Sequence, residues 1–262
     1  DACLDGVVVC DVMSPGKATC SESTDPAVAY VFSGSNGGIQ SYDVSDPVNP
    51  IWLSSASTES LGGVFFTKGT VRGDLVFAVD SWFNGLGLAI IDFSDPSSPE
   101  VVGTYTPEKP SAQLVSALAV EGDLAYVGVH TCHEAWTGTG NGYAPCAQAP
   151  AIPSSGLHVV DISDPSSPAL LGAVYWMGDE GPPLPQDIEV VDGVAYVAGR
   201  NGLITIDVTN PSNPDGLDIY DPWTQTFCES YYQTELEIEN CSAWGAASSI
   251  EIVGDRAYLS GG

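Results

Sequence analysis

Short apolar runs alternate along the chain with polar stretches rich in glycine, proline, aspartate and asparagine. The clearest segment is 187–220, which reads DIEVVDGVAYVAGRNGLITIDVTNPSNPDGLDIY. Its apolar runs IEVV, VAYVA, LITIDV and GLDIY are separated by Asp-Gly, by Asn-Gly and by a stretch with two prolines. Asp-Gly and Asn-Gly between apolar runs are strong signals for a β-hairpin. The segment therefore predicts four antiparallel strands in a meander.

This pattern recurs through the chain. The first proline of the two-proline turn falls at Pro47, Pro96, Pro165 and Pro211, and AYVFSG, LVFAVD, AYVGVH and AYVAGR precede the four turns. Repeated four-stranded meanders are typical of β-propeller blades. We therefore expect an all-β fold in which residues 28–262 form about four to five four-stranded antiparallel blades of a larger ring. Residues 1–27 are expected to form an N-terminal segment with a cysteine-closed loop.

The turn itself has a physical explanation. In the runs LAII and LHVV successive residues are apolar, so both faces of these strands are expected to be buried. Proline then ends the strand, because it fixes φ and has no N–H to donate. An aspartate stands at the strand end in every full unit, and short acidic side chains accept hydrogen bonds from turn amides. We interpret these aspartates as structural turn residues: Asp43, Asp92, Asp161 and Asp207.

The strands LAIID, LHVVD and LITID, each followed by [IVF]-[ST]-[DN]-P-x-x-P, resemble the LVIVD repeat. The resemblance covers about 28–262 apart from two insertions, and the first copy, IQSYD, is degenerate. Proteins with this repeat are secreted or lie on the cell surface of bacteria and archaea, and they are held to form β-propellers. The resemblance thus implies a fold and a location, and it implies no catalytic residues.

The fifth copy of the repeat, AYLSGG, lacks the third and fourth strands of a blade. An open blade would leave apolar side chains and a strand edge uncovered. We expect the remainder of the same polypeptide to cover them, in preference to another chain. A strand near residues 7–9 that closes the ring is the alternative.

The charge balance is strongly acidic, with 34 acidic residues against 6 basic ones and a net charge of −28. Such a surface repels nucleic acid and anionic membranes, and no apolar run is long enough to cross a bilayer. It suits a basic partner or a medium that contains salt or calcium, although solubility alone is a sufficient explanation. No cofactor is predicted, with calcium as the one candidate.

Six of the seven cysteines fall into short-range pairs, and no Cys-x-x-Cys motif is present. Closely spaced pairs favour disulfides and an oxidising compartment. We therefore predict an extracellular, cell-surface or periplasmic protein. Cys3 is left over, and it could pair with a member of the first pair or outside the chain. The predicted pairs are Cys10 with Cys20, Cys132 with Cys146, and Cys228 with Cys241.

Two insertions interrupt the repeat, at about 130–155 and 221–247, and loops on a rigid scaffold commonly carry function. The first contains His130 and His133, which are weak candidates for binding a metal, because Cys132 has a partner in Cys146. The second contains a predicted strand with one acidic and one apolar face among aromatic residues, which suits contact with a protein or glycan. The alternative is a self-contained hairpin, closed by Cys228 and Cys241, whose aromatic residues pack on the blade. The candidate interaction residues are Trp223, Tyr231, Tyr232, Glu235, Glu237 and Glu239.

No G-x-S-x-G, H-E-x-x-H or calcium-loop motif is present, so the sequence gives no support for known hydrolase or metalloprotease chemistry. The inner strands of the predicted blades begin near Ser116, Asp187 and Ser249, which could line one mouth of a central channel. Two hypotheses follow. The first is a binding scaffold that contacts another protein chain or a glycan through the insertions. The second is a propeller enzyme or metal-binding protein with a site at the channel.

Overall fold

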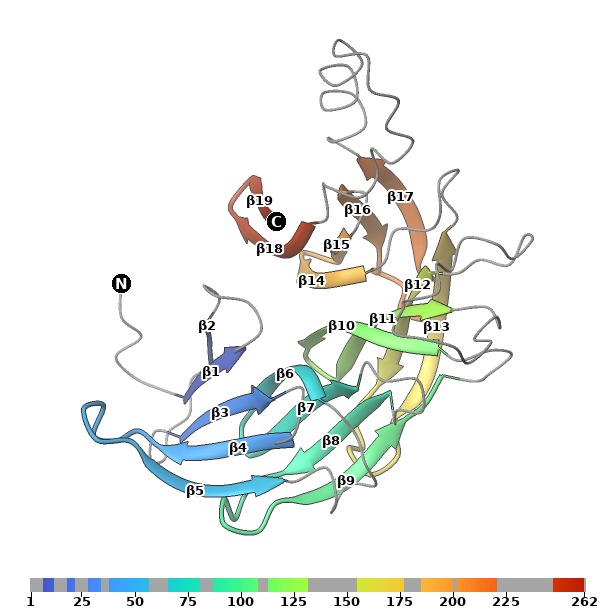
Figure 1. Ribbon diagram of the computed structural model, residues 1–262. Helices are drawn as coiled ribbons and strands as arrows, with labels where there is room; N and C mark the ends of the chain where they lie inside the picture. The colour runs from blue at the N-terminus through green and yellow to red at the C-terminus, as the bar shows by residue number, and fades with distance from the viewer. Residues whose placement is uncertain are drawn as a thin grey trace, which may run out of the picture. The chain divides into compact units, whose positions relative to one another are not determined.

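The computed structural model (Figure 1) describes residues 7–11, 18–21, 28–33, 38–56, 66–80, 87–107, 113–131, 155–176, 185–199, 202–220 and 247–261. Every regular element in these ranges is a β-strand, so the all-β expectation is confirmed. The chain divides into two compact units. Unit 1 comprises Asp1–Glu108 and Asp161–Ala169, and unit 2 comprises Lys109–Val160 and Leu170–Gly262.

Unit 1 contains two sheets. One is a four-stranded antiparallel meander in the order β6-β7-β8-β9. The other has the order β2-β1-β3-β4-β5, in which β3 to β5 form the meander and β1 pairs with β3 in parallel. Their bounds are β1 Val7–Asp11, β2 Ala18–Ser21, β3 Val28–Ser33, β4 Gly38–Asp43, β5 Ile51–Ala56, β6 Phe66–Arg72, β7 Leu75–Asp80, β8 Leu88–Asp92 and β9 Glu100–Tyr105.

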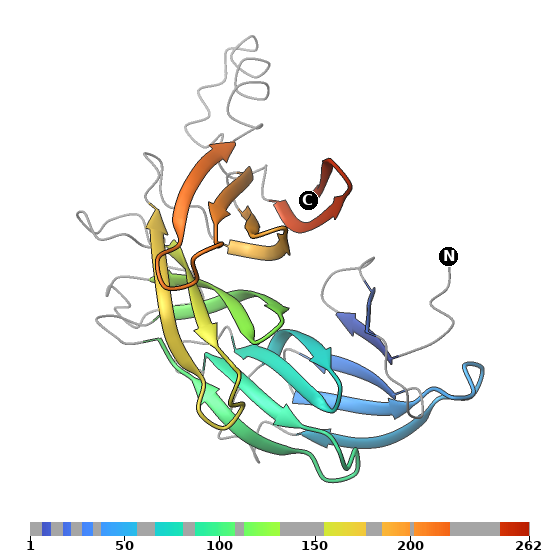
Figure 2. The ribbon, with the colours of Figure 1, turned by 180° about the vertical axis from the view of Figure 1, so that it is seen from behind.

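Unit 2 contains the four-stranded sheets β10-β11-β12-β13 and β14-β15-β16-β17 and the two-stranded sheet β18-β19. The first strands of these sheets, β10, β14 and β18, lie side by side (Figures 1 and 2). The bounds are β10 Gln113–Glu121, β11 Leu124–Thr131, β12 Ser155–Asp161, β13 Ala169–Trp176, β14 Pro185–Val191, β15 Val194–Gly199, β16 Gly202–Asp207, β17 Asp215–Tyr220, β18 Ala247–Val253 and β19 Arg256–Gly261.

The Asp-Gly hairpin predicted from the sequence lies between β14 and β15. Asp192 and Gly193 have φ angles of 51° and 76°, and Val191 pairs with Val194 across the turn. Two successive residues with positive φ define the tight hairpin turn whose twist matches that of the flanking strands. Because an aspartate followed by glycine tolerates this geometry, the dipeptide fixes the register of the β14-β15 pair.

The third strands β8 and β12 are deeply buried. In β8, Leu88, Ala89, Ile90 and Ile91 each have 0% of their surface exposed. A run that is buried at consecutive positions must be covered on both faces, because successive side chains of a strand point to opposite sides. One face of β8 lies in a core cluster with residues of β3, where the rings of Tyr30 and Phe93 meet edge to face at 4.8 Å.

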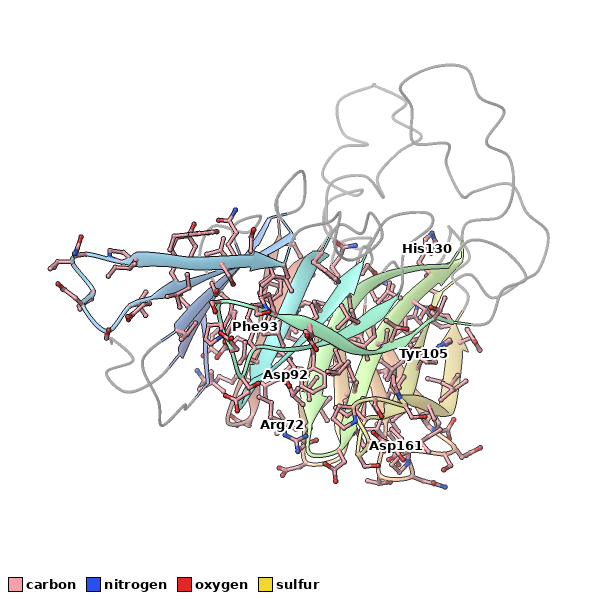
Figure 3. All side chains as sticks on the ribbon, turned by 90° about the horizontal axis from the view of Figure 1, so that it is seen from below. Arg72, Asp92, Phe93, Tyr105, His130 and Asp161 are labelled. Atoms are coloured by element: carbon pink, nitrogen blue, oxygen red, sulfur yellow. The ribbon has the colours of Figure 1, made fainter. Side chains whose placement is uncertain are left out.

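The proline turn that follows each third strand is closed by hydrogen bonds of the same kind in every copy. The backbone N–H of Ser98 donates to the carbonyl of Asp95 at 2.9 Å, which closes the turn around Pro96. Asp92, at the end of β8 (Figure 3), accepts the N–H of Ser94 at 2.7 Å. The aspartates at the other three turns accept in the same way, from Ser45, Ser163 and Thr209.

The turn also contacts the outer strand of the preceding sheet. The carbonyl of Pro96 accepts hydrogen bonds from the hydroxyls of Ser41 and Ser54. The carbonyls of later turns face glycines in the same way, Pro165 against Gly103 and Pro211 against Gly172. We call the fourth residue after the second proline of each turn the joint position. It is occupied by Ser54, Gly103, Gly172 and Asp218.

A methyl group at the joint position should destabilise the fold. A Cβ atom on Gly172 would lie 2.5 Å from the carbonyl oxygen of Pro211 and 2.8 Å from the Cδ atom of Pro214. These are backbone and ring atoms that cannot rotate away, so Gly172→Ala should lower the free energy of unfolding by about 1–3 kcal/mol. Urea denaturation of the full chain measures this change.

Gly216 is the matched control, because it lies in β17 of the same unit and a Cβ there would have no atom within 4 Å. Gly216→Ala should leave the unfolding midpoint unchanged within about 0.5 kcal/mol. If the two variants lost the same free energy of unfolding, the contact between the turn and the outer strand would not be what limits the size of the side chain at the joint position.

Candidate functional site

Both insertions leave unit 2 from the same edge. The first strands of the three sheets begin side by side, because the hydroxyl of Ser116 in β10 donates to the carbonyl of Pro185 in β14 at 2.5 Å. The N–H of Ile250 in β18 likewise donates to Asp187 of β14 at 3.0 Å. In an antiparallel meander, the second and fourth strands end at the edge of the sheet where the first strand begins. We call this side of unit 2 the insertion edge.

The described residues that flank each insertion lie at the insertion edge. Residues 132–154 follow β11 and precede β12, and residues 221–246 follow β17 and precede β18. Within each sheet these strand ends lie at the edge where β10, β14 and β18 begin. The two cysteine-containing stretches therefore join the scaffold on one side, in consecutive sheets.

Of the residues predicted to line a channel mouth, Ser116 and Asp187 form hydrogen bonds between first strands. Besides the bonds of Ser116 and Asp187, the N–H of Ile252 donates to Glu189 at 2.7 Å. Ser249 pairs with Ser260 in the β18-β19 register. Ser116 is the bulged residue of β10, whereas Asp187 and Ser249 each follow the bulge of their strand. The bulge turns polar groups of one first strand toward the backbone of the next.

The first insertion begins next to a buried polar pair. His130, near the end of β11 (Figure 3), is 3% exposed, and its Nδ1 atom lies 3.1 Å from the hydroxyl of the fully buried Ser155 in β12. A buried polar pair with a shared hydrogen bond fixes the two strand ends relative to each other. The pair therefore gives the first insertion an ordered base.

A second histidine in the same sheet is held neutral. His158 is 2% exposed, and its Nε2 atom lies 2.8 Å from the hydroxyl of Tyr175, with the two rings edge to face at 5.5 Å. Burial lowers the pKa of His158 to about 4, because the charged imidazolium loses its hydration. At neutral pH the ring is therefore an uncharged hydrogen-bonding partner of a half-exposed tyrosine.

The turn aspartates form a separate acidic set at the opposite ends of the strands. Hydrogen bonds from the side chain and then from the backbone of Ser45 lower the pKa of Asp43. Hydrogen bonds from the side chain and then the backbone of Ser163 lower the pKa of Asp161, and those of Thr209 lower the pKa of Asp207. These carboxylates are exposed and use their oxygens for turn amides, which is a structural arrangement.

Several predicted site residues lie outside the described residues. For two of the cysteines the structure describes the backbone pairing: Cys10 lies opposite Ala18, and Cys20 lies opposite Val8. The remaining candidates in the two insertions are Cys132, His133, Cys146, Trp223, Cys228, Tyr231, Tyr232, Glu235, Glu237, Glu239 and Cys241.

The sequence reasoning missed the joint position and the role of Glu189. The sequence did contain a signal for the joint position. When the four copies of the turn motif are aligned, this position is occupied by serine, glycine, glycine and aspartate. The signal for Glu189 was a single carboxylate inside the otherwise apolar run IEVV. Its partner, Ile252, is 63 residues away, so the local pattern does not reveal it.

In the described part of the chain, no three histidine, cysteine or acidic side chains are grouped to hold a metal ion. The same residues contain no helix long and apolar enough to span a bilayer.

The buried histidine predicts a pH dependence of stability. The unfolded chain binds a proton at His158 below its ordinary pKa of 6.5, whereas the folded protein resists protonation until about 4. The unfolded state therefore holds more protons in this window, and the free energy of unfolding should fall by roughly 3 kcal/mol from pH 6.5 to 4. Urea denaturation at several pH values measures the slope.

His158→Phe removes the titrating group, so its pH slope in this window should be smaller than that of the wild type. Tyr175→Phe is the matched control, because it removes the hydrogen-bond partner and leaves the buried imidazole. If the three proteins gave the same slope between pH 4 and 6.5, burial of His158 would not be the cause.

Comparisons with known proteins agree with this geometry. The family model "LVIVD repeat" matches residues 70–107, 151–175 and 185–221, which include β7 to β9, β12 with most of β13, and β14 to β17. No curated protein matches the chain. The repeats recognised in the sequence are thus those that form the complete four-stranded sheets.

Similar solved structures are remote in sequence. The computationally designed Ika8 protein has a TM-score of 0.51 at 8% identity, over 94% of this chain and 56% of its own, so this chain spans little more than half of its length. The designed Ika4 protein has a TM-score of 0.43 at 9% identity, over 70% and 86% of the two chains. Glutaminyl cyclase from Myxococcus xanthus has a TM-score of 0.44 at 13% identity, over 98% and 84%. Three segments of the chain match the LVIVD repeat, and its four-stranded meanders have the fold of β-propeller blades.

Proposed function

We propose that this protein is an extracellular or cell-surface binding scaffold that contacts another protein chain or a glycan through its two insertions. The observation that carries the proposal is the insertion edge, where both stretches join unit 2. Two loops that start from one side of a rigid scaffold can contact one partner together, as binding loops on β-sandwiches and barrels do.

The scaffold beneath the insertions is built to hold their ends in place. His130 and Ser155 form a buried pair at the start and end of the first insertion. Ala247, at the end of the second, is 1% exposed and lies in a core cluster with Ile250. Buried anchors reduce the conformational freedom that a loop loses on binding, which favours affinity.

The composition of the insertions indicates the chemistry of the partner. The second insertion carries Tyr231, Tyr232, Glu235, Glu237 and Glu239 within a few residues of one another. Tyrosine and tryptophan are enriched where protein surfaces bind tightly, and carboxylates accept hydrogen bonds from basic side chains or sugar hydroxyls. The net charge of −28 further favours a basic or neutral partner over an acidic one.

The alternative, an enzyme or metal site at the channel, would draw on the starts of the first strands. There Ser116 and Asp187 donate to or accept from the backbone of a neighbouring strand. A side chain that is hydrogen-bonded in this way stabilises the packing of two first strands. This role favours the binding-scaffold hypothesis over a site at the channel.

The proposal includes disulfides that close the insertions, Cys132 with Cys146 and Cys228 with Cys241. Each pair spans a short loop, and a disulfide lowers the entropy of an otherwise unconstrained segment. Intact mass before and after reduction, with peptide mapping, should give two such bonds. Free thiols at these four positions in protein secreted through an oxidising compartment would contradict both the pairing and the extracellular location.

Loss of aromatic side chains from the second insertion should weaken binding without a change in fold. The triple variant Trp223→Ser, Tyr231→Ser, Tyr232→Ser should lose at least about tenfold in affinity, the usual consequence of removing central aromatic contacts. Binding of the labelled full chain to a glycan array and to intact cells, before and after surface proteolysis, measures this effect and separates glycan from protein partners.

Trp52→Ser is the matched control, because Trp52 is a 57% exposed aromatic on the outer strand β5 of unit 1. It should bind like the wild type. Equal losses in both variants, or binding that survives replacement of both insertions by glycine-serine linkers, would show that contacts lie elsewhere on the protein.

A further inference from the structure

The β10–β13 sheet of unit 2 departs from the repeat at one buried position. His158 lies in β12, three residues before the strand-end Asp161, and it is 2% exposed. At the same place β8 and β16 carry apolar residues, Ala89 at 0% and Ile204 at 3% exposure. An apolar side chain therefore satisfies the packing at this position, and the imidazole of His158 adds a hydrogen-bonding group that such a side chain lacks.

A second departure from the repeat, on the neighbouring outer strand, meets the first. Tyr175 lies near the end of β13, three residues after the joint position Gly172, where the β6–β9 copy has Thr106. Its hydroxyl oxygen lies 2.8 Å from Nε2 of His158, and the two rings are edge to face. The two unusual residues thus form one hydrogen-bonded pair, in which His158 is buried and Tyr175 is 43% exposed.

The ring of Tyr175 is held in place although a large part of it is exposed. A Cβ atom on Gly156 would lie 2.6 Å from Cδ1 of Tyr175 and 2.6 Å from the carbonyl oxygen of Val174, so the ring packs over a residue that has no side chain. The hydroxyl is fixed at the same time by His158. An exposed aromatic ring that is already ordered loses little conformational entropy when a ligand binds to it.

Tyr175 lies on the side of unit 2 where the first insertion joins the scaffold. Gly156, which lies under the ring, is the second residue of β12, and residues 132–154 precede this strand. Trp176, the next residue after Tyr175, ends β13 at the insertion edge. The exposed ring and the end of the first insertion are therefore neighbours on one surface of the sheet.

The insertion edge of unit 2 differs in charge from the opposite edge. The residues at which β10 to β19 begin or end on the insertion edge, from Gln113 of β10 to Gly261 of β19, are all uncharged. A partner that is attracted by charge would be drawn to the opposite edge, so the insertion edge suits a neutral ligand. The acidic residues at the opposite ends of the described strands and in their hairpins are Glu121, Asp123, Asp192, Asp207, Asp215 and Asp255.

A neutral saccharide has the chemistry that this surface can bind. The C–H groups on one face of a sugar ring carry a partial positive charge, and they pack against the electron-rich face of an aromatic ring. Sugar hydroxyls form hydrogen bonds with amides and carboxylates and need no charged partner. The sequence of the first insertion agrees with this chemistry, because residues 132–154 contain one charged residue, Glu134, together with Trp136, Asn141 and Gln148.

We infer that Tyr175 is a stacking platform for a neutral saccharide and that His158 positions its ring, an inference that rests on the binding role proposed for the insertion edge. The sugar ring packs on the exposed part of Tyr175. His158 is buried and acts through Tyr175, so it is a positioning residue. The partner assigned to this edge is thus a glycan in preference to a protein chain.

The test uses the full chain and immobilised polysaccharides, with galactomannan, β-glucan and galactan as neutral probes and alginate and polygalacturonate as acidic ones. The chain should bind at least one neutral probe. Binding to the acidic probes should be at least about tenfold weaker, because the net charge of −28 repels them. Biolayer interferometry measures each affinity, and soluble oligosaccharides of the bound probe should compete.

Tyr175→Ser removes the ring and should weaken binding to the neutral probe by about tenfold or more, as the loss of a well-packed aromatic contact does. Tyr175→Phe keeps the ring without its hydroxyl and should give a smaller loss. Tyr258→Ser is the matched control, because Tyr258 is a 53% exposed tyrosine of the same unit that lies near the β18-β19 hairpin turn. It should bind like the wild type.

His158→Ile introduces the residue found at Ile204, removes the hydrogen bond to Tyr175 and should weaken binding about as much as Tyr175→Phe. His158→Gln should restore most of the affinity. Gln40 stands at the same place in β4, and its Oε1 atom accepts the hydroxyl of Tyr42 at 2.7 Å. A side chain with a purely structural role would give no such rescue. Circular dichroism of each variant checks the fold.

Unchanged binding in Tyr175→Ser would overturn the platform, and unchanged binding in His158→Ile would overturn the positioning role. If no neutral probe were bound, or if the acidic probes were bound equally well, the saccharide would be the wrong partner. Binding to intact cells that is lost after surface proteolysis and insensitive to deglycosylation would overturn the inference and leave the proposed scaffold function standing.

Replacement of both insertions by glycine-serine linkers separates the two proposals. Saccharide binding that survives this replacement would contradict the proposed function of the insertions. A loss caused by Tyr175→Ser in the same linker variant would still support the platform.

Discussion

The need to cover both faces of an apolar strand shapes the whole chain. β8 and β12 are buried at consecutive positions, and a single sheet cannot bury both sides of its own strand. Each sheet must therefore pack against a neighbour. Repetition of one meander satisfies this requirement, because every copy offers the same apolar side chains to the next. The turn after the third strand then contacts the outer strand of the previous sheet, where Ser54, Gly103 and Gly172 accommodate it.

The acidic composition is partly a consequence of this construction. Asp43, Asp92, Asp161 and Asp207 accept turn amides, and Asp187 and Glu189 accept backbone N–H groups of the adjacent first strand. Backbone donors at strand ends and bulges have no ladder partner, and a carboxylate satisfies them at little steric cost. These six of the 34 acidic residues therefore have a structural role in the scaffold.

The same construction separates positions that recur in every sheet from positions that occur once. The turns and the joint positions recur in every sheet, so they are required by packing. The insertions occur once each, and the described residues that flank them lie at the insertion edge, where His130 and Ser155 form a buried pair. At the joint position of β17 stands Asp218, whose carboxylate accepts the N–H of Ile219 at 2.9 Å.

The local pattern of the sequence determined the strands, the Asp-Gly hairpin and the aspartate-capped proline turns. Each of these depends on residues that are close in the chain, such as Asp192 and Gly193 or Asp92 and Ser94. The LVIVD motif added the association of the meanders into propeller blades. The tertiary structure alone decided which residues meet between sheets. Ser116 reaches Pro185 across 69 residues, and Glu189 reaches Ile252 across 63. A two-residue periodicity fixes which side chains share a face, but it does not fix which face of another sheet they will meet. For that reason the joint position became recognisable only when the sheets were packed together.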